Sequence, residues 1–231
     1  MSPSNDTLEF HTRRNVEATS VWLHGQGASS EDLIPVLKHL TGSRELGLRY
    51  LAPEAPMRLL EATGKRPGRA WYDMASPDST EPDPETLTET QRRITELLDT
   101  DRQQGMPTER TLIGGFSQGG AIALHIGMQY PHSLAGIIVL SGELIDSENL
   151  QDRISPANAN TPILMIHGQH DTLIPLQEAE ANRDRLRAAG LCVDWHSLPL
   201  DHEISMDTLG IVDQWMQARL QDQGVTGNRD D

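Results

Sequence analysis

The sequence predicts an α/β protein, a single domain with a doubly wound and mostly parallel sheet. Short runs that are nearly continuous in Leu, Ile and Val alternate with longer stretches whose apolar residues recur at helical spacing. Continuous apolar runs suit strands covered on both faces, and strands that alternate with helices pair in parallel through right-handed crossovers. The length of 231 residues, with 36% hydrophobic and 23% charged residues, suits one such globular domain.

Six apolar runs are expected to form the strands. They are residues 20–23, 50–52, 111–116, 136–141, 162–167 and 192–198. Cys192, the only cysteine, begins the last run and is expected to be a buried strand residue rather than a nucleophile. A lone cysteine excludes an intramolecular disulfide, so a reducing compartment is expected.

Five helices are expected between and after these strands. They cover about residues 30–41, 83–105, 118–130, 176–189 and 203–220. The second begins with Asp83 as a cap and with Pro84, because proline suits the first helical position. The third stops at Pro131 and the fourth at Gly190. Four methionines are interpreted as core filler: Met128, Met165, Met206 and Met216.

The α/β domain is expected to span residues 20–220, after an N-terminal segment at 1–19 and before a flexible tail at 221–231. Residues 57–85 are rich in Pro, Gly, Ser and Thr, so we predict a long loop there. Loops of this length are commonly functional.

The chain is acidic, with 34 Asp and Glu against 19 Lys and Arg and a formal net charge of −15. This balance argues against a nucleic-acid partner and against docking on an anionic membrane surface. No apolar run reaches the ~18 residues of a membrane span, so no stable membrane insertion is expected. The N-terminus lacks the apolar core of a signal peptide, which favours a cytoplasmic location.

Residues 115–119 read GFSQG, a G-x-S-x-G pentapeptide that follows an apolar strand and opens a helix. This is the context of a nucleophile elbow, so Ser117 is the predicted nucleophile. Its turn is so tight that side chains at Gly115 and Gly119 would collide with the backbone. The N-terminus of the helix adds a positive dipole near the serine hydroxyl.

A serine hydroxyl needs a general base, and in this type of fold the partners follow in the order Ser, Asp or Glu, His. Asp171 lies in the loop after the strand at 162–167, and His202 follows the strand at 192–198. The carboxyl ends of parallel strands share one edge of the sheet, where sites assemble. We therefore predict a triad of Ser117, Asp171 and His202.

Other assignments are less favourable. Asp201 adjoins the histidine in sequence, but neighbouring side chains seldom orient each other, and Asp194 lies inside a strand. His167 and His170 with Asp171 could suggest a metal cluster, yet no further ligand pair has metal spacing. We expect no metal or cofactor, and we interpret His167 as a packed histidine.

The sequence HGQG at 24–27 follows the first apolar run as a turn of small residues. Such a turn is expected to carry one N–H of an oxyanion hole, and the N–H of Gln118 should be the other. Two donors stabilise the tetrahedral intermediate, and loss of one typically costs about 2.7–4 kcal/mol.

Together these segments resemble the carboxylesterase/acyl-protein thioesterase family of α/β-hydrolases, also called the phospholipase/carboxylesterase family. The matching segments are LHG at 23–25, AWYD at 70–73, GFSQGG at 115–120, LSG at 140–142, HGQHD at 167–171 with Pro175, and HE at 202–203. They span about residues 20–220, almost the whole chain.

The resemblance implies an α/β-hydrolase fold with little or no cap. It implies Ser117, Asp171 and His202 as the triad, and the N–H groups of Gln26 and Gln118 as the oxyanion hole. It also places Leu173 at the acyl pocket. The implied substrate is a small-molecule ester or thioester, without a cofactor, and a homodimer is compatible with it.

Two positions depart from the family pattern. Relatives commonly have Leu where Gln26 stands, and Gly where Asp201 stands. Trp71 has two possible roles. It either forms an apolar wall for the substrate or, together with Tyr72, anchors the long loop to the core, and the anchor is favoured.

We predict a serine carboxylesterase for short- to medium-chain esters. The alternatives are an acyl-protein thioesterase or lysophospholipase for long acyl chains, and a non-catalytic binding scaffold.

Overall fold

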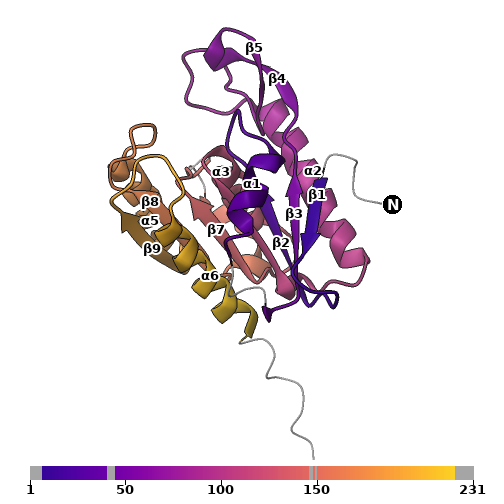
Figure 1. The fold of residues 1–231 in the computed structure, drawn as a ribbon. Coiled ribbons are helices and arrows are strands. Elements are labelled where there is room, and N and C mark those ends of the chain that lie inside the picture. The colour runs from indigo at the N-terminus through magenta and orange to yellow at the C-terminus, as the bar shows by residue number, and fades with distance from the viewer. Residues whose placement is uncertain (1–6, 41–44, 146–147, 149, 222–231) are drawn as a thin grey trace, which may run out of the picture.

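The computed structural model describes residues 7–40, 45–145, 148 and 150–221. A seven-stranded sheet crosses the molecule in the order β1-β3-β2-β6-β7-β8-β9 (Figure 1). The strands are β1 (Thr7–His11), β2 (Ala18–Leu23), β3 (Leu48–Pro53), β6 (Thr111–Phe116), β7 (Gly136–Leu140), β8 (Ile163–Gly168) and β9 (Val193–Leu198). Strand β1 pairs antiparallel with β3, and every other pair in this sheet is parallel.

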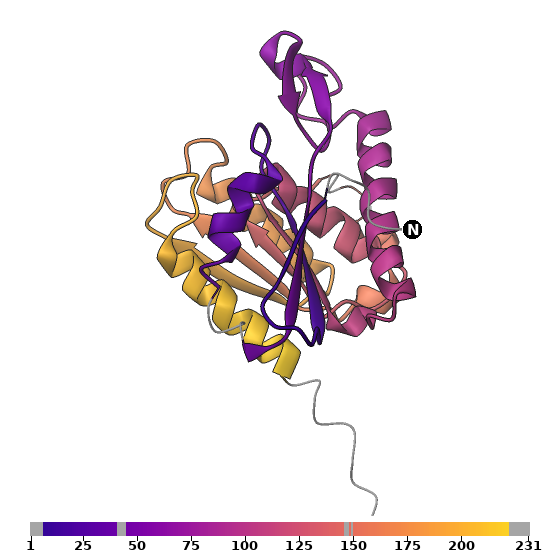
Figure 2. The same ribbon diagram turned by 45° about the vertical axis from the view of Figure 1, so that its right-hand side comes forward.

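Helices cover both faces of the sheet (Figures 1 and 2). They are α1 (Ser30–Leu37), α2 (Pro84–Gln103), α3 (Gln118–Gln129), α4 (Leu150–Arg153), α5 (Leu176–Ala188) and α6 (Met206–Gln221). Short 3₁₀ helices are η2 (Glu61–Thr63), η3 (Thr108–Arg110) and η4 (Pro156–Asn158). Helix α2 begins as predicted, because the Asp83 side chain accepts a hydrogen bond from the Thr86 N–H.

Two apolar clusters fill the space on either side of the sheet. One joins α2, α3 and α5 to one face, and the other joins α1 and α6 to the opposite face. Strands β2, β7 and β8 are buried along their whole length. A parallel strand covered on both faces has no polar side, which explains the continuous apolar runs and confirms the predicted fold class.

The structure adds two elements that the apolar pattern did not predict. Strand β1 lies within the N-terminal segment assigned to residues 1–19, where most side chains are polar and partly exposed. The predicted loop at 57–85 contains a hairpin of β4 (Met57–Leu60) and β5 (Arg66–Arg69). The hairpin projects beyond the sheet (Figure 1), and both strands leave side chains in solvent, so neither has a continuous apolar run.

Two burial predictions were wrong. Cys192 is exposed and precedes β9 instead of lying within it, because the ladder with β8 begins at Val193. Met206 is 64% exposed because it begins α6 on the solvent side. Met128, Met165 and Met216 are buried, as predicted. The tail assigned to 221–231 lies outside the described residues apart from Gln221, the last residue of α6.

The strand order reverses between β2 and β6. From β2 the chain continues outward to β3, and after the hairpin it returns to the other side of β2 as β6. Open α/β sheets bind their ligands at such a switch point, beyond the carboxyl ends of the strands. A ligand-binding site is therefore expected at the turns that follow β2 and β6. None of the helices in the described ranges is both long and apolar enough to cross a bilayer.

Candidate active site

Ser117 occupies a sharp turn between β6 and α3. Its backbone has φ 54° and ψ −123°, a conformation that L-residues adopt only under strain. The two flanking glycines are sterically required. A Cβ at Gly115 would lie 2.4 Å from backbone atoms of Gly119, and a Cβ at Gly119 would lie 2.1 Å from the Leu23 carbonyl oxygen. The G-x-S-x-G pattern thus reflects close contact between the elbow and the end of β2.

The three predicted side chains meet at the carboxyl edge of the sheet. His202 Nε2 lies 2.8 Å from Ser117 Oγ, and His202 Nδ1 lies 2.8 Å from Asp171 Oδ2. The other oxygen of Asp171 accepts the N–H groups of Leu173 at 3.0 Å and Ile174 at 2.8 Å. Because the carboxylate accepts from Nδ1–H, the lone pair of Nε2 faces the serine hydroxyl.

His167 is a packed histidine beside Asp171. Its ring is buried, with Nε2 2.9 Å from the Ile174 carbonyl oxygen and 3.4 Å from Asp171 Oδ2. The ring stacks on Trp195 at a centroid distance of 6.3 Å, and His170 is exposed. Over residues 7–40, 45–145, 148 and 150–221, no three His, Cys, Asp or Glu side chains could hold a metal ion.

The β2–α1 turn, residues 24–29, lies against the elbow. A Cβ at Gly25 would be 3.3 Å from Phe116 Cδ1 and 3.4 Å from the Ser117 Cβ, so the turn packs closely against the elbow. Gly27 donates its N–H to the Arg69 carbonyl oxygen at 2.8 Å, which ties the turn to β5. The N–H groups of Gln26 and Gln118 belong to the two segments that approach each other here.

The Gln118 side chain joins three segments around the elbow. Its Oε1 accepts the Trp71 N–H at 2.8 Å, and its Nε2 donates to the Tyr72 carbonyl oxygen at 2.9 Å. The same Nε2 lies 3.3 Å from the side-chain oxygen of Gln26. Sequence reasoning assigned only the backbone of Gln118 a role, although its position directly after Ser117 places its buried amide where these bonds form.

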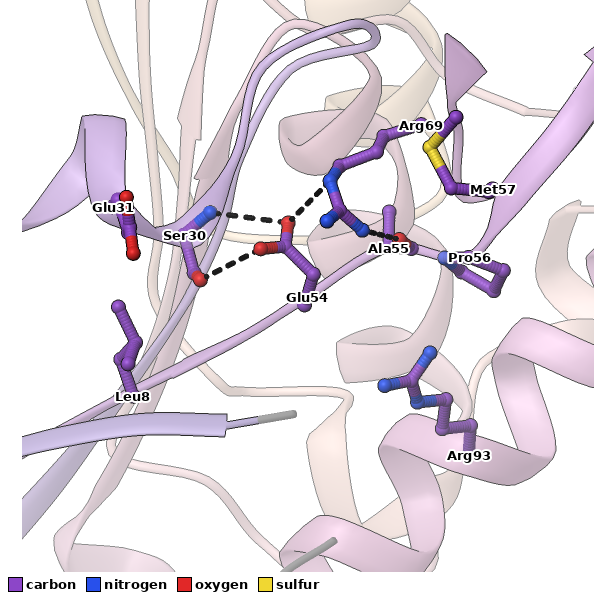
Figure 3. A pocket seen from close by; sticks show the side chains of 9 residues that line it. All are labelled: Leu8, Ser30, Glu31, Glu54, Ala55, Pro56, Met57, Arg69 and Arg93. Atoms are coloured by element: carbon purple, nitrogen blue, oxygen red, sulfur yellow. Dashed lines mark hydrogen bonds and ion pairs between the residues drawn. The ribbon is translucent and has the colours of Figure 1, made fainter. Parts of the chain in front are cut away.

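Glu54 supports the β2–α1 turn from the other side (Figure 3). Its carboxylate accepts the N–H and the hydroxyl of Ser30 at 3.2 and 3.1 Å, and it lies 3.5 Å from the Arg69 Nε. Arg69 also donates to the Ala55 carbonyl oxygen at 3.2 Å. These groups line a cavity of about 350 Å³. No motif marks Glu54 or Arg69, so sequence reasoning missed both.

His24 adds a buried contact within the same turn. Its carbonyl oxygen accepts the Trp71 indole N–H at 2.7 Å. Its Nε2 lies 2.9 Å from Glu54 Oε1 and accepts the Ala55 N–H at 3.0 Å. Burial lowers the pKa of the His24 ring, which favours the neutral form that can accept this bond.

A pocket of about 260 Å³ opens beside the serine hydroxyl; we call it the Ser117 pocket. It is lined by Ser117, Gln26, Tyr72, Met74, Gln118, Ala121, Glu143, Leu173 and Ile174. Leu173 lies at this pocket, as the resemblance implied, and is 72% exposed. The substrate-binding assignment of Trp71 is corrected, because Trp71 is fully buried and does not line the pocket. Its hydrogen bonds to His24 and Gln118 make it the anchor of the loop.

A model of the phospholipase/carboxylesterase family matches residues 10–220. The chain belongs to the phospholipase/carboxylesterase family. The resemblance seen in the motifs is confirmed, and the chain is a hydrolase of the class that acts on carboxylic esters and thioesters.

Relatives in this phospholipase/carboxylesterase family include both esterases and thioesterases. The chain is 26% identical over 223 residues to acyl-protein thioesterase 1 of Gibberella zeae, covering 92% of this chain and 95% of that protein. It is 28% identical over 214 residues to carboxylesterase SOBER1 of Arabidopsis thaliana, covering 89% and 92%.

Solved structures agree with this membership. The crystal structure of Arabidopsis thaliana SOBER1 aligns with a TM-score of 0.82 at 28% identity, covering 88% of this chain and 99% of that chain. Acyl-protein thioesterase 2 of Zea mays aligns with a TM-score of 0.79 at 27% identity, covering 93% and 98%.

Asp201, which the resemblance set apart from the family pattern, has a local role in the structure. Its Oδ1 accepts the N–H and hydroxyl of Thr172 at 2.9 and 3.0 Å and the N–H of His202 at 2.8 Å. These donors hold the pKa of Asp201 below its ordinary value. Asp201 therefore links the loop of Asp171 to the loop of His202. Asp194 accepts from the Trp215 indole at 2.7 Å and stays outside the site.

Proposed function

We propose that this protein is a serine carboxylesterase that hydrolyses short- to medium-chain esters through an acyl-enzyme, with thioesters as a second substrate class. The observation that carries the proposal is the chain of contacts from Asp171 through His202 to Ser117, with 2.8 Å at each step. A hydroxyl, an imidazole and a carboxylate in this order form the arrangement that activates a serine for acyl transfer.

In the acylation step, His202 Nε2 takes the proton of Ser117 Oγ while that oxygen attacks the carbonyl carbon of the ester. Asp171 Oδ2 stabilises the imidazolium that forms. The carbonyl oxygen becomes an oxyanion, and the N–H groups of Gln26 and Gln118 bind it. When the tetrahedral intermediate collapses, the leaving alcohol or thiol takes the proton from His202 Nε2.

In the deacylation step, water enters beside His202 and loses a proton to Nε2 as it attacks the acyl-enzyme. A second tetrahedral intermediate forms with its oxyanion in the same place. Its collapse releases the acid and returns the proton to Ser117 Oγ, so that the enzyme is restored. The reaction needs only these side chains and water.

Small and partly polar acyl groups fit the Ser117 pocket best. Ligand pockets commonly enclose about 300–1,000 Å³, whereas this one encloses about 260 Å³. Its wall includes the polar side chains of Gln26, Tyr72 and Glu143 beside apolar Met74 and Ile174. A long alkyl chain would have to leave the pocket and cover exposed surface.

The test is to label the protein with a fluorophosphonate and then to measure hydrolysis of oxygen and sulfur esters from acetyl to palmitoyl. We expect covalent labelling at Ser117 and the highest kcat/KM for short to medium chains. A maximum at decanoyl or beyond would favour the long-chain thioesterase or lysophospholipase instead. A folded protein that neither reacts with the probe nor hydrolyses any ester would be a binding scaffold.

A further inference from the structure

Glu143 is a carboxylic acid in the wall of the Ser117 pocket, and the mechanism does not use it. It follows β7 after Ser141, which has a positive φ of 46°, and Gly142. A Cβ at Gly142 would lie 2.9 Å from the Ala121 N, so this turn packs tightly against α3. Packing of this kind holds Glu143 beside the nucleophile.

Among the residues that the structure describes, the Glu143 carboxylate has no hydrogen-bonding or ion-pair partner. The side chain is nevertheless partly buried. It also lines a neighbouring pocket of about 340 Å³, whose wall includes Glu81 and Glu148. A charged group that is withdrawn from water without a partner is costly, so a ligand that brings a compensating group is favoured there.

The electrostatic surroundings of Glu143 are mostly negative. Burial raises the pKa of its carboxyl, and the negative charges of Glu178 and Asp171 raise it further, whereas His202 lowers it. Tyr72 faces Glu143 across the pocket wall, and burial keeps its phenol neutral by raising its pKa. Among the described residues, no arginine or lysine lines the Ser117 pocket.

The lining of the Ser117 pocket favours placing Glu143 on the acyl side of the bond to be broken. The leaving group must be near His202, which protonates it, and His202 does not line the Ser117 pocket. Gln26 and Gln118, whose N–H groups would bind the carbonyl oxygen, do line it. The part of the substrate that enters this pocket is therefore the acyl group.

We infer that Glu143 determines acyl specificity and selects short acyl groups that carry a positive charge, such as an ammonium, over apolar or anionic ones of the same chain length. This inference rests on the proposed function. A carboxylate and an ammonium form a charge-assisted hydrogen bond that neither a methyl nor a second carboxylate can replace. The substrate class is thus the esters of short ω-amino acids.

The experiment compares kcat/KM for three ethyl esters whose terminal group begins at the same position of the acyl chain. Ethyl butyrate ends in a methyl group, the ethyl ester of β-alanine ends in an ammonium, and monoethyl succinate ends in a carboxylate. Selectivity is the kcat/KM for the β-alanine ester divided by that for ethyl butyrate. Comparing this ratio between variants cancels the different intrinsic reactivities of the esters.

In Glu143→Gln the selectivity is expected to fall roughly ten- to a hundredfold, and monoethyl succinate should improve relative to ethyl butyrate. Glu143→Leu, which has no polar end, should lower the selectivity at least as much. Glu148→Gln is the matched control, because Glu148 lines only the neighbouring pocket. Its selectivity should equal that of the wild type.

A second measurement follows the wild-type selectivity with pH. Lowering the pH protonates Glu143 and should reduce the selectivity, whereas the ratio in Glu143→Gln should stay constant. The ionisable groups that act on Glu143, namely Asp171, Glu178 and His202, are present in both proteins.

Unchanged selectivity in both Glu143 variants would overturn the inference. If ethyl butyrate were still hydrolysed and the wild type still reacted with a fluorophosphonate, the proposed function would stand without it. A wild type that hydrolyses none of the three esters and does not react with the probe would contradict the proposed function itself.

Discussion

The triad and the β2–α1 turn are both held at the carboxyl edge of the sheet, but by different means. The triad side chains bond directly to each other, at 2.8 Å in each contact. The turn is held by groups around it: the Arg69 carbonyl accepts the Gly27 N–H, and Glu54 accepts from Ser30. A substitution in the triad therefore removes a reacting group, whereas one around the turn only displaces a backbone donor.

The largest effect is expected from Ser117→Ala, which removes the attacking oxygen. Turnover of ethyl butyrate should fall by a factor of about 10⁴–10⁶. The unfolding midpoint serves as the control for folding. A variant that is folded and keeps wild-type turnover would exclude Ser117 as the nucleophile. The triad would then not differ from the β2–α1 turn by containing the reacting group.

The next largest effect is expected from Asp171→Asn. The amide keeps the shape but no longer favours the Nδ1–H tautomer of His202, so kcat should fall by about 10⁴. Thr172→Val is a neighbouring control, because it loses only the hydroxyl bond to Asp201. Equal losses in the two variants would mean that loop position, and not the tautomer, limits the rate.

Gln118→Ala tests the turn directly. It keeps the backbone N–H but removes the side-chain bonds to Trp71, Tyr72 and Gln26. Displacement of a donor by about 1 Å can cost a hundredfold, so kcat should fall by about that factor. Fluorophosphonate labelling should persist at a reduced rate. Loss of all labelling would mean that the Gln118 side chain is as essential for the reactivity of Ser117 as the triad itself.

Glu54→Gln should have a smaller effect, because glutamine can still accept from Ser30. Losing the charge that faces Arg69 is expected to lower kcat roughly three- to tenfold, with little change in KM. Glu31→Gln is the matched control, since Glu31 lines the same cavity but forms no bond to the turn within the described ranges. If the two variants behave alike, Glu54 does not position the turn.

The smallest effect is expected from Asp201→Ala, which loses the link between the loops of Asp171 and His202. We expect a roughly two- to threefold lower kcat/KM at neutral pH. The lowered pKa of Asp201 means that the carboxylate contributes above its ordinary pKa and loses its effect only as the pH falls through the lowered value. Wild type and variant should therefore converge in acid, and a difference that grows in acid would contradict this role.

The sequence predicted the triad because each member is tied to a local signal. Ser117 has a steric motif, and Asp171 and His202 follow apolar runs whose carboxyl ends share an edge. The parallel strands were predictable for a similar reason, since a strand that is buried on both faces has a continuous run of apolar residues. These predictions needed no knowledge of side-chain packing.

The surroundings of the triad were less predictable. Glu54 and Glu143 lie in turns after β3 and β7. No local sequence pattern distinguishes a glutamate that supports a turn or contacts the substrate from a glutamate that is only solvated. The β4–β5 hairpin was missed because Pro67 and Gly68 interrupt its pattern. Cys192 was misassigned because an apolar run does not show where its ladder begins.

The position of Cys192 has a practical consequence. It is exposed just before β9, whereas His202 follows the opposite end of that strand. The only thiol in the chain thus lies at the rim of the sheet away from the serine. A maleimide dye attached there would label each molecule at a single position away from the substrate entrance. A surface tether attached there would immobilise every molecule in one orientation and leave that entrance open.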